Sequence, residues 1–250
     1  MTTAIRPTAN RKVPMTWLRK TALAAGVLYV LSFVSIPTLG LYSGLRDPNY
    51  VVGPGSGTGA IWGGVLEMIV ALAGIGTAVV LYPVVKRQNE ALALGFVGVR
   101  VLEAATIVSG VVIVMSMVTL RQAGAGTDAL ATGKALVAMH NWTFLTGQGF
   151  LPAVNALLLG SLLYQSRLVP RVLPLLGFIG APLLAISAIA TLFGFWTQVS
   201  PQSGLLTIPI AVWEFSLGVY LIVKGFKPSP ITAGIVAAGT RPVDRQVVAA

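Results

Sequence analysis

Long apolar segments alternate with short polar ones along this chain of 250 residues. An apolar segment of about 20 residues is long enough to cross a hydrocarbon core about 30 Å thick as an α-helix. A membrane β-barrel would instead show alternating apolar and polar positions. We therefore predict an all-α, polytopic membrane protein with six transmembrane helices, at about residues 21–42, 60–85, 91–120, 142–164, 172–196 and 207–223.

Three regions follow from this pattern. Residues 1–20 form a basic segment, 21–223 form the six-helix domain, and 224–250 are rich in Pro, Gly and basic residues, which predicts a largely disordered tail. The first apolar run exceeds the 7 to 15 residues usual for a signal peptide, so we expect it to remain as an anchor. We expect Asp128 to cap a helix that extends the fourth span outward.

Composition narrows the class of protein. Hydrophobic residues make up 55% of the chain and charged residues only 10%, against roughly a quarter in soluble domains. The absence of cysteine excludes disulfides, thiolate metal sites and iron–sulfur clusters. With His140 as the only histidine, multi-histidine metal sites are excluded too. We expect no metal and no cofactor.

The net charge of +10 is distributed unevenly. The segments on the side of the termini hold Arg6, Arg11, Lys12, Arg19, Lys20, Lys86, Arg87, Arg167, Arg171, Lys224, Lys227, Arg241 and Arg245. The opposite segments hold only Arg46, Arg121 and Lys134. Because short cytoplasmic segments are enriched in Lys and Arg, we predict that both termini are cytoplasmic in the plasma (inner) membrane. The expected partners are the lipid bilayer and its anionic headgroups, and not a nucleic acid.

Aromatic residues near the ends of the predicted spans fit the same map. Tryptophan and tyrosine are enriched at membrane–water interfaces. We interpret these residues as interface anchors: Trp17, Trp62, Trp142, Trp196, Tyr42, Tyr82 and Tyr164.

Four polar residues within the spans share one depth. At about 1.5 Å per residue, Arg100, Asn155 and Glu214 lie about 14 Å from the cytoplasmic ends of their helices, and Glu103 about 18 Å. Charged residues inside a bilayer face protein or water and often mark functional sites. We therefore predict that these four form a midplane cluster that binds a solute or proton, with Arg100 and Glu103 pairing along one helix.

Three further polar residues lie toward the opposite surface. Glu67 lies about 27 Å from the cytoplasmic end of its span. Gln148 shares a helical face with Pro152 and Asn155, and His140 lies just above that face. We interpret Glu67, His140 and Gln148 as candidates for an outer mouth, from which a polar path would lead to the midplane.

A purely structural role is the alternative for all of these residues. Arg100 and Glu103 can neutralise each other, while Gln148 and Asn155 can hold helices together by hydrogen bonds. One arginine cannot neutralise Glu67, Glu103 and Glu214 together, however, so at least one carboxyl needs a proton or another cation. A water-accessible cavity at this layer would favour function, and a dry, fully paired network would favour structure.

The third span, the fourth-to-fifth connection and the end of the sixth carry a family resemblance. The stretches RVLEAATIVSG, LLYQSRLVPRVLPLLGFIG and EFSLGVYLIVKGFKPS resemble an uncharacterised family of six-helix bacterial membrane proteins, the domain of unknown function DUF4386. The resemblance covers about residues 15–230. It implies an integral membrane protein and supplies no activity.

Three functions fit the sequence. The first is binding or transport of a small solute or proton at the midplane cluster. The second is a non-catalytic membrane component that recruits or stabilises a partner through its basic turns and tail. The third and least favoured is an intramembrane hydrolase using Glu103 and Glu214, since the chain lacks a G-x-S-x-G elbow and a P-loop.

Overall fold

The computed structural model describes residues 15–47, 49–53, 55–124 and 126–235. Within these ranges the chain is helical and contains no strand, as predicted. The helices are α1 (Trp17–Leu31), α2 (Thr38–Leu41), α3 (Thr58–Val85), α4 (Glu90–Gln122), α5 (Leu130–Gly147), α6 (Leu151–Ser166), α7 (Val172–Leu192) and α8 (Pro201–Val223). Short 3₁₀ helices lie at Ser32–Ser35, Ser43–Arg46, Thr127–Ala129 and Pro230–Thr232.

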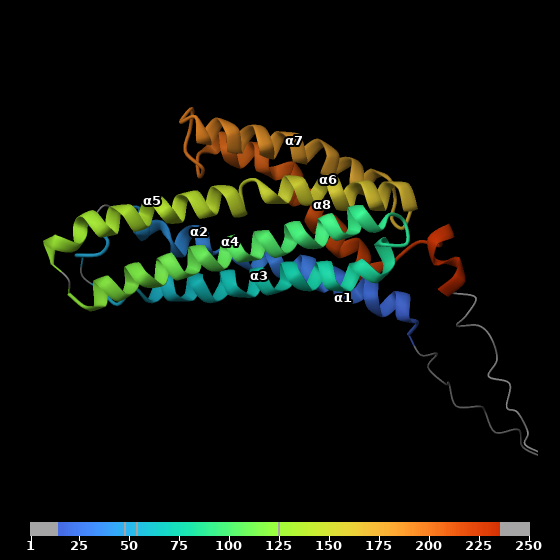
Figure 1. The fold of residues 1–250 in the computed structure, drawn as a ribbon, viewed down its shortest axis with the longest axis horizontal. Coiled ribbons are helices and arrows are strands. Elements are labelled where there is room, and N and C mark those ends of the chain that lie inside the picture. The colour runs from blue at the N-terminus through green and yellow to red at the C-terminus, as the bar shows by residue number, and fades with distance from the viewer. Residues whose placement is uncertain (1–14, 48, 54, 125, 236–250) are drawn as a thin grey trace, which may run out of the picture.

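Six helical segments of the described chain are long and apolar enough to cross a membrane. They form an elongated bundle in which α3, α4 and α5 run along the long axis (Figure 1). Many apolar side chains, such as Leu72, Val79, Val112 and Ile179, remain exposed on this bundle. So much exposed apolar surface requires lipid as the solvent, which agrees with a multi-pass membrane protein.

Local sequence sets several helix ends. The Asn89 side chain accepts a hydrogen bond from the backbone of Leu92 at the start of α4, and Ser200 caps α8 in the same way. Such caps satisfy backbone N–H groups that have no partner within the helix. With Ser200 as its N-cap residue, the sixth helix begins at Pro201, six residues before the start predicted at 207.

The first span is not one straight helix, which differs from the prediction for 21–42. It begins at Trp17, passes through the 3₁₀ helix at Ser32–Ser35 and ends with α2. Pro37 has no N–H to donate to the carbonyl of Phe33, which instead accepts a hydrogen bond from the N–H of Ile36 at 3.1 Å. The backbone therefore changes its winding between α1 and α2.

The fourth span is also interrupted. The prediction of one helix over 142–164 is wrong here, because α5 ends at Gly147 and α6 begins at Leu151. Pro152 lies in the first turn of α6, where its missing N–H does no harm. Asp128 lies in the preceding 3₁₀ helix and does not cap α5, whose N-cap residue is Ala129.

The fifth span and the tail differ from prediction as well. Helix α7 ends at Leu192, four residues earlier than predicted, and is followed by Gly194 in a left-handed conformation. Residues 226–232 were predicted to be disordered, yet they pack against the bundle. The N–H of Lys227 donates to Leu168 at 2.8 Å and the Ser229 hydroxyl donates to Ser166 at 2.5 Å. Residues 1–14 and 236–250 lie outside the described part of the chain.

Close contacts between backbones place α1 against α8. A Cβ atom on Gly26 would lie 2.6 Å from the carbonyl oxygen of Gly218, so the absence of a side chain permits this approach. Near the start of α1, Arg19 donates hydrogen bonds to the carbonyls of Leu221 and Ile222 at the end of α8. The described chain therefore starts and ends at the same end of the bundle (Figure 1).

Candidate functional site

The middle of α4 holds the only Arg–Glu pairs found among the described residues. Arg100 and Glu103, at 6% and 8% exposure, lie one turn apart, and Arg100 Nη1 contacts Glu103 Oε2 at 3.1 Å. The spacing of three residues places both side chains on one face of the helix. The predicted pairing of these two residues along α4 is confirmed.

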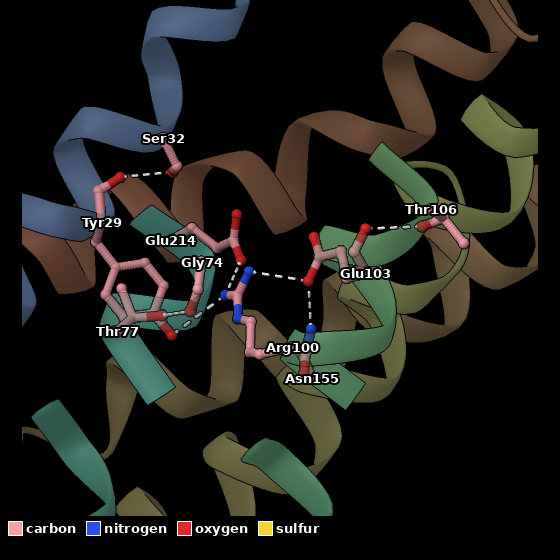
Figure 2. A network of polar contacts seen from close by, with 9 residues as sticks. All are labelled: Tyr29, Ser32, Gly74, Thr77, Arg100, Glu103, Thr106, Asn155 and Glu214. Carbon is pink, nitrogen blue, oxygen red and sulfur yellow. Dashed lines mark hydrogen bonds and ion pairs between the residues drawn. The ribbon is translucent and has the colours of Figure 1, made fainter. Parts of the chain in front are cut away.

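Helix α8 adds a second carboxylate to the same guanidinium. Arg100 Nη2 lies 2.9 Å from Glu214 Oε1 and also donates to the Tyr29 hydroxyl at 3.3 Å (Figure 2). The guanidinium carbon lies 5.4 Å from the centre of the Tyr29 ring and 5.8 Å from that of Phe96. Aromatic faces attract cations, and this attraction grows when water is excluded. Arg100 is therefore held by four helical side chains from α1, α4 and α8.

Asn155 completes the cluster from α6. Its Nδ2 donates to Glu103 Oε2 at 2.6 Å, and the side chain is fully buried (Figure 2). The structure thus brings together all four residues predicted to share the midplane layer. Straight helices cross the bilayer in parallel, so equal distances along the chain gave nearly equal depths.

We define the Arg100 cluster as Arg100, Glu103, Asn155, Glu214 and Tyr29. The charges in this cluster do not balance. One guanidinium faces two carboxylates, so the cluster carries a net charge of −1 when all three groups are ionised. Two of its buried polar atoms, Arg100 Nε and Asn155 Oδ1, have no hydrogen-bond partner among the described residues. The network is therefore not a fully paired, closed one.

A cavity of about 240 Å³ reaches this cluster, and we call it the inner cavity. Arg100, Glu103 and Glu214 form its charged wall. Its remaining wall includes Ser32 and Ser35 from the 3₁₀ segment, and Gln148 from the break between α5 and α6. Irregular backbone at membrane depth is tolerated where it is buried in protein or lines a cavity. Both breaks in the spans thus border the same space.

The outer candidates form a separate cluster. Glu67, on α3, is only 3% exposed. Its two carboxylate oxygens each accept one hydrogen bond at 3.1 Å, Oε2 from the Tyr42 hydroxyl and Oε1 from Gln148 Nε2. His140 packs edge-on against the Tyr42 ring, with centroids 5.5 Å apart. The structure therefore brings Glu67 and Gln148 into contact, with Tyr42 joining Glu67 to His140.

A second, larger cavity of about 590 Å³, the outer cavity, adjoins this cluster. Glu67, Tyr42 and His140 line the outer cavity, whereas Gln148 lines the inner one. The hydrogen bond between Gln148 and Glu67 thus links residues on the walls of the two cavities. The polar path predicted from the outer mouth to the midplane is divided at this contact.

Two tyrosines were missed or misassigned from the sequence. Tyr42 was interpreted as an interface anchor, but it is 7% exposed and its hydroxyl bonds to Glu67, which corrects that prediction. Tyr29, 1% exposed, was not predicted to be part of the site. Its position in the middle of an apolar run, where a tyrosine hydroxyl needs a partner, was the signal that could have found it.

Comparison with known proteins gives a family and no closer relative. Neither the curated proteins nor the solved structures compared with this sequence gave a match. The sequence model of the family described as "Domain of unknown function (DUF4386)" matches residues 24–225, from α1 to just beyond α8. This match confirms the resemblance carried by the third, fourth and sixth spans. The chain belongs to the DUF4386 family.

Proposed function

We propose that this protein binds a proton or a small solute at the Arg100 cluster and moves it across the membrane. The observation that carries the proposal is the contact between the inner cavity and a cluster of unequal charge, Arg100 against Glu103 and Glu214. Burial of an uncompensated charge in a low-dielectric interior is costly, so the extra carboxylate favours uptake of a cation. A proton is the smallest species that restores neutrality.

The size and walls of the inner cavity support this choice. At about 240 Å³ it is smaller than the roughly 300–1,000 Å³ usual for drug-sized ligands. It suits a few water molecules or a small solute. Transporters commonly place their sites near the bilayer midplane between interrupted helices. The break at Ser32–Ser35 and the break after Gly147 both border this cavity, which supports transport over a purely structural role.

The proposal includes an orientation. We place both termini in the cytoplasm and the protein in the plasma membrane, because Lys and Arg are concentrated in the segments on the side of the termini. Both described chain ends lie at one end of the bundle, as this orientation requires (Figure 1). In this orientation the inner cavity extends from the Arg100 cluster toward the side opposite the termini, because its wall continues from Arg100 and Glu214 to Ile107 and Thr207. The basic segments on the cytoplasmic side would contact anionic lipid headgroups.

Proton flux in proteoliposomes tests the proposal. The purified full-length chain is reconstituted in vesicles that contain a pH-sensitive dye, and a potassium diffusion potential drives proton entry. We expect the wild-type protein to acidify the lumen faster than protein-free vesicles. Glu214→Gln removes the extra carboxylate and should reduce the rate to the protein-free level. Glu90→Gln, the same substitution at an exposed position of α4, is the matched control and should retain the wild-type rate.

Folding of each variant is checked by gel filtration and thermal unfolding before flux is compared. A wild-type rate equal to that of protein-free vesicles would overturn proton movement. Equal rates in the wild type and a correctly folded Glu214→Gln variant would remove the Arg100 cluster from the mechanism.

A further inference from the structure

The outer cavity is a second polar site, separate from the Arg100 cluster. Its volume of about 590 Å³ lies within the range of small-molecule binding sites. Glu67 from α3, Tyr42 near α2, His140 and Trp142 from α5, and Trp196 after α7 all line it. Parts of the chain that are far apart in sequence thus converge on one concave space.

When Glu67 is ionised, it gives this cavity a negative charge that no described Lys or Arg of its lining balances. The carboxylate is 3% exposed, and both side chains that hydrogen-bond to it, Tyr42 and Gln148, are neutral. Among the described residues that line the cavity there is no Lys or Arg. The other titratable residues that line the cavity are Tyr42 and His140. A bound cation would supply the missing positive charge, and Glu67 would need little further desolvation because it is already buried.

Aromatic rings form much of the remaining wall. His140 stands edge-on to Tyr42 at 5.5 Å and stacks on Phe144 at 6.3 Å, so these rings form a continuous surface. Trp142 also lines the cavity and is 51% exposed. Aromatic faces near a carboxylate are the usual recognition surface for ammonium groups.

We infer that the outer cavity binds a small organic cation, a protonated amine or quaternary ammonium, with Glu67 as its counter-ion and Tyr42 and Trp142 as its aromatic walls. Transition-metal ions and Ca²⁺ fit this cavity poorly, since their protein sites usually combine several carboxylate or imidazole ligands. The part of the chain that the structure describes has no group of three or more such residues. An organic cation needs only one counter-ion and an apolar, aromatic enclosure.

Calorimetric titration of the full-length protein in lipid nanodiscs tests this inference. The probes are tetraethylammonium chloride and choline chloride, with sodium chloride at the same ionic strength as the reference. The titration is run at about pH 8, where an unperturbed carboxyl group is ionised. We expect saturable binding of at least one ammonium probe and none of sodium.

Three variants locate the site. Glu67→Gln should weaken ammonium binding by about tenfold or more, since it removes a desolvated charge partner. Trp142→Ala, at a half-exposed position, should weaken it by roughly threefold through loss of a cation–π contact. Glu214→Gln changes the inner cavity alone and should leave the affinity within about twofold of the wild type.

The outcomes separate this inference from the proposed proton movement. Absence of saturable binding of either ammonium probe would overturn the organic-cation site, whatever the proton flux. Equal affinity in the wild type and Glu67→Gln would overturn the role of Glu67. A loss of affinity in Glu214→Gln as large as that in Glu67→Gln would place the cation in the inner cavity instead. If Glu67→Gln does not fold, the Trp142→Ala titration decides, and unchanged affinity there would overturn the aromatic wall.

Discussion

Gln148 donates a hydrogen bond of 3.1 Å to Glu67, and the two residues line different cavities. Gln148 lies at the break between α5 and α6, where the chain has no regular helix. A Cβ atom on the neighbouring Gly149 would lie 2.6 Å from the carbonyl oxygen of Leu145, so the break depends on a glycine at that position. The residue that makes the polar contact between the cavities therefore lies at the interruption of the fourth span.

Removal of the Gln148 side chain should increase access from the outer cavity to the inner one. The chain lacks cysteine, so a single Ala104→Cys substitution on the wall of the inner cavity reports access to a small charged thiol reagent. We expect faster labelling when Gln148→Ala is added, because the amide that contacts Glu67 is lost. Thr197→Cys, on the outer cavity, is the control and should react at the same rate with and without Gln148→Ala. An unchanged rate at Ala104→Cys would mean that Gln148 does not separate the cavities.

Arg100 should stabilise the fold as well as the site. Arg100→Leu leaves the buried Glu103 and the partly buried Glu214 without their partner. Breaking a buried ion pair by removing one member costs about 3–5 kcal/mol. We expect a large decrease in the thermal unfolding temperature. Addition of Glu103→Gln and Glu214→Gln to the same chain should restore much of the lost unfolding temperature, because no charge then remains in the cluster. A triple variant as unstable as Arg100→Leu alone would contradict this electrostatic explanation.

The sequence predicted four of the five residues of the Arg100 cluster because depth in a membrane follows from counting residues along nearly straight helices. It did not predict that Tyr29 would bond to Arg100 or Tyr42 to Glu67, since those contacts depend on how α1 and α2 pack against α3 and α4. The interruptions escaped prediction for a related reason. Pro37 and Pro152 were visible, but an apolar run alone does not distinguish a continuous helix from one whose break lines a cavity.

At position 155, the charge of the side chain that replaces Asn155 should affect the stability of the protein more than its shape does. Its Nδ2 donates to Glu103 at 2.6 Å in a fully buried setting. Asn155→Leu removes this donor and should destabilise the protein by about 1–3 kcal/mol. Asn155→Asp is nearly the same size, yet it adds a third carboxylate beside Glu103 and should be worse. Thermal unfolding of both variants at neutral pH measures the difference, and an Asp variant as stable as the wild type would contradict the net negative charge assigned to the cluster.

The contact between α1 and α8 gives a prediction that depends on backbone spacing alone. A Cβ atom on Gly26 would lie 2.6 Å from the carbonyl oxygen of Gly218 and 2.8 Å from Ile222, so Gly26→Ala must separate the two helices. Overpacking of this kind costs about 1–3 kcal/mol. Gly98→Ala is the matched control, since a Cβ atom there meets nothing within 4 Å, and it should be neutral or slightly stabilising. Because Tyr29 on α1 and Glu214 on α8 both contact Arg100, Gly26→Ala should also lower proton flux in proteoliposomes while Gly98→Ala does not. Equal stability of the two variants would show that α1 and α8 do not pack as closely as Gly26 and Gly218 indicate.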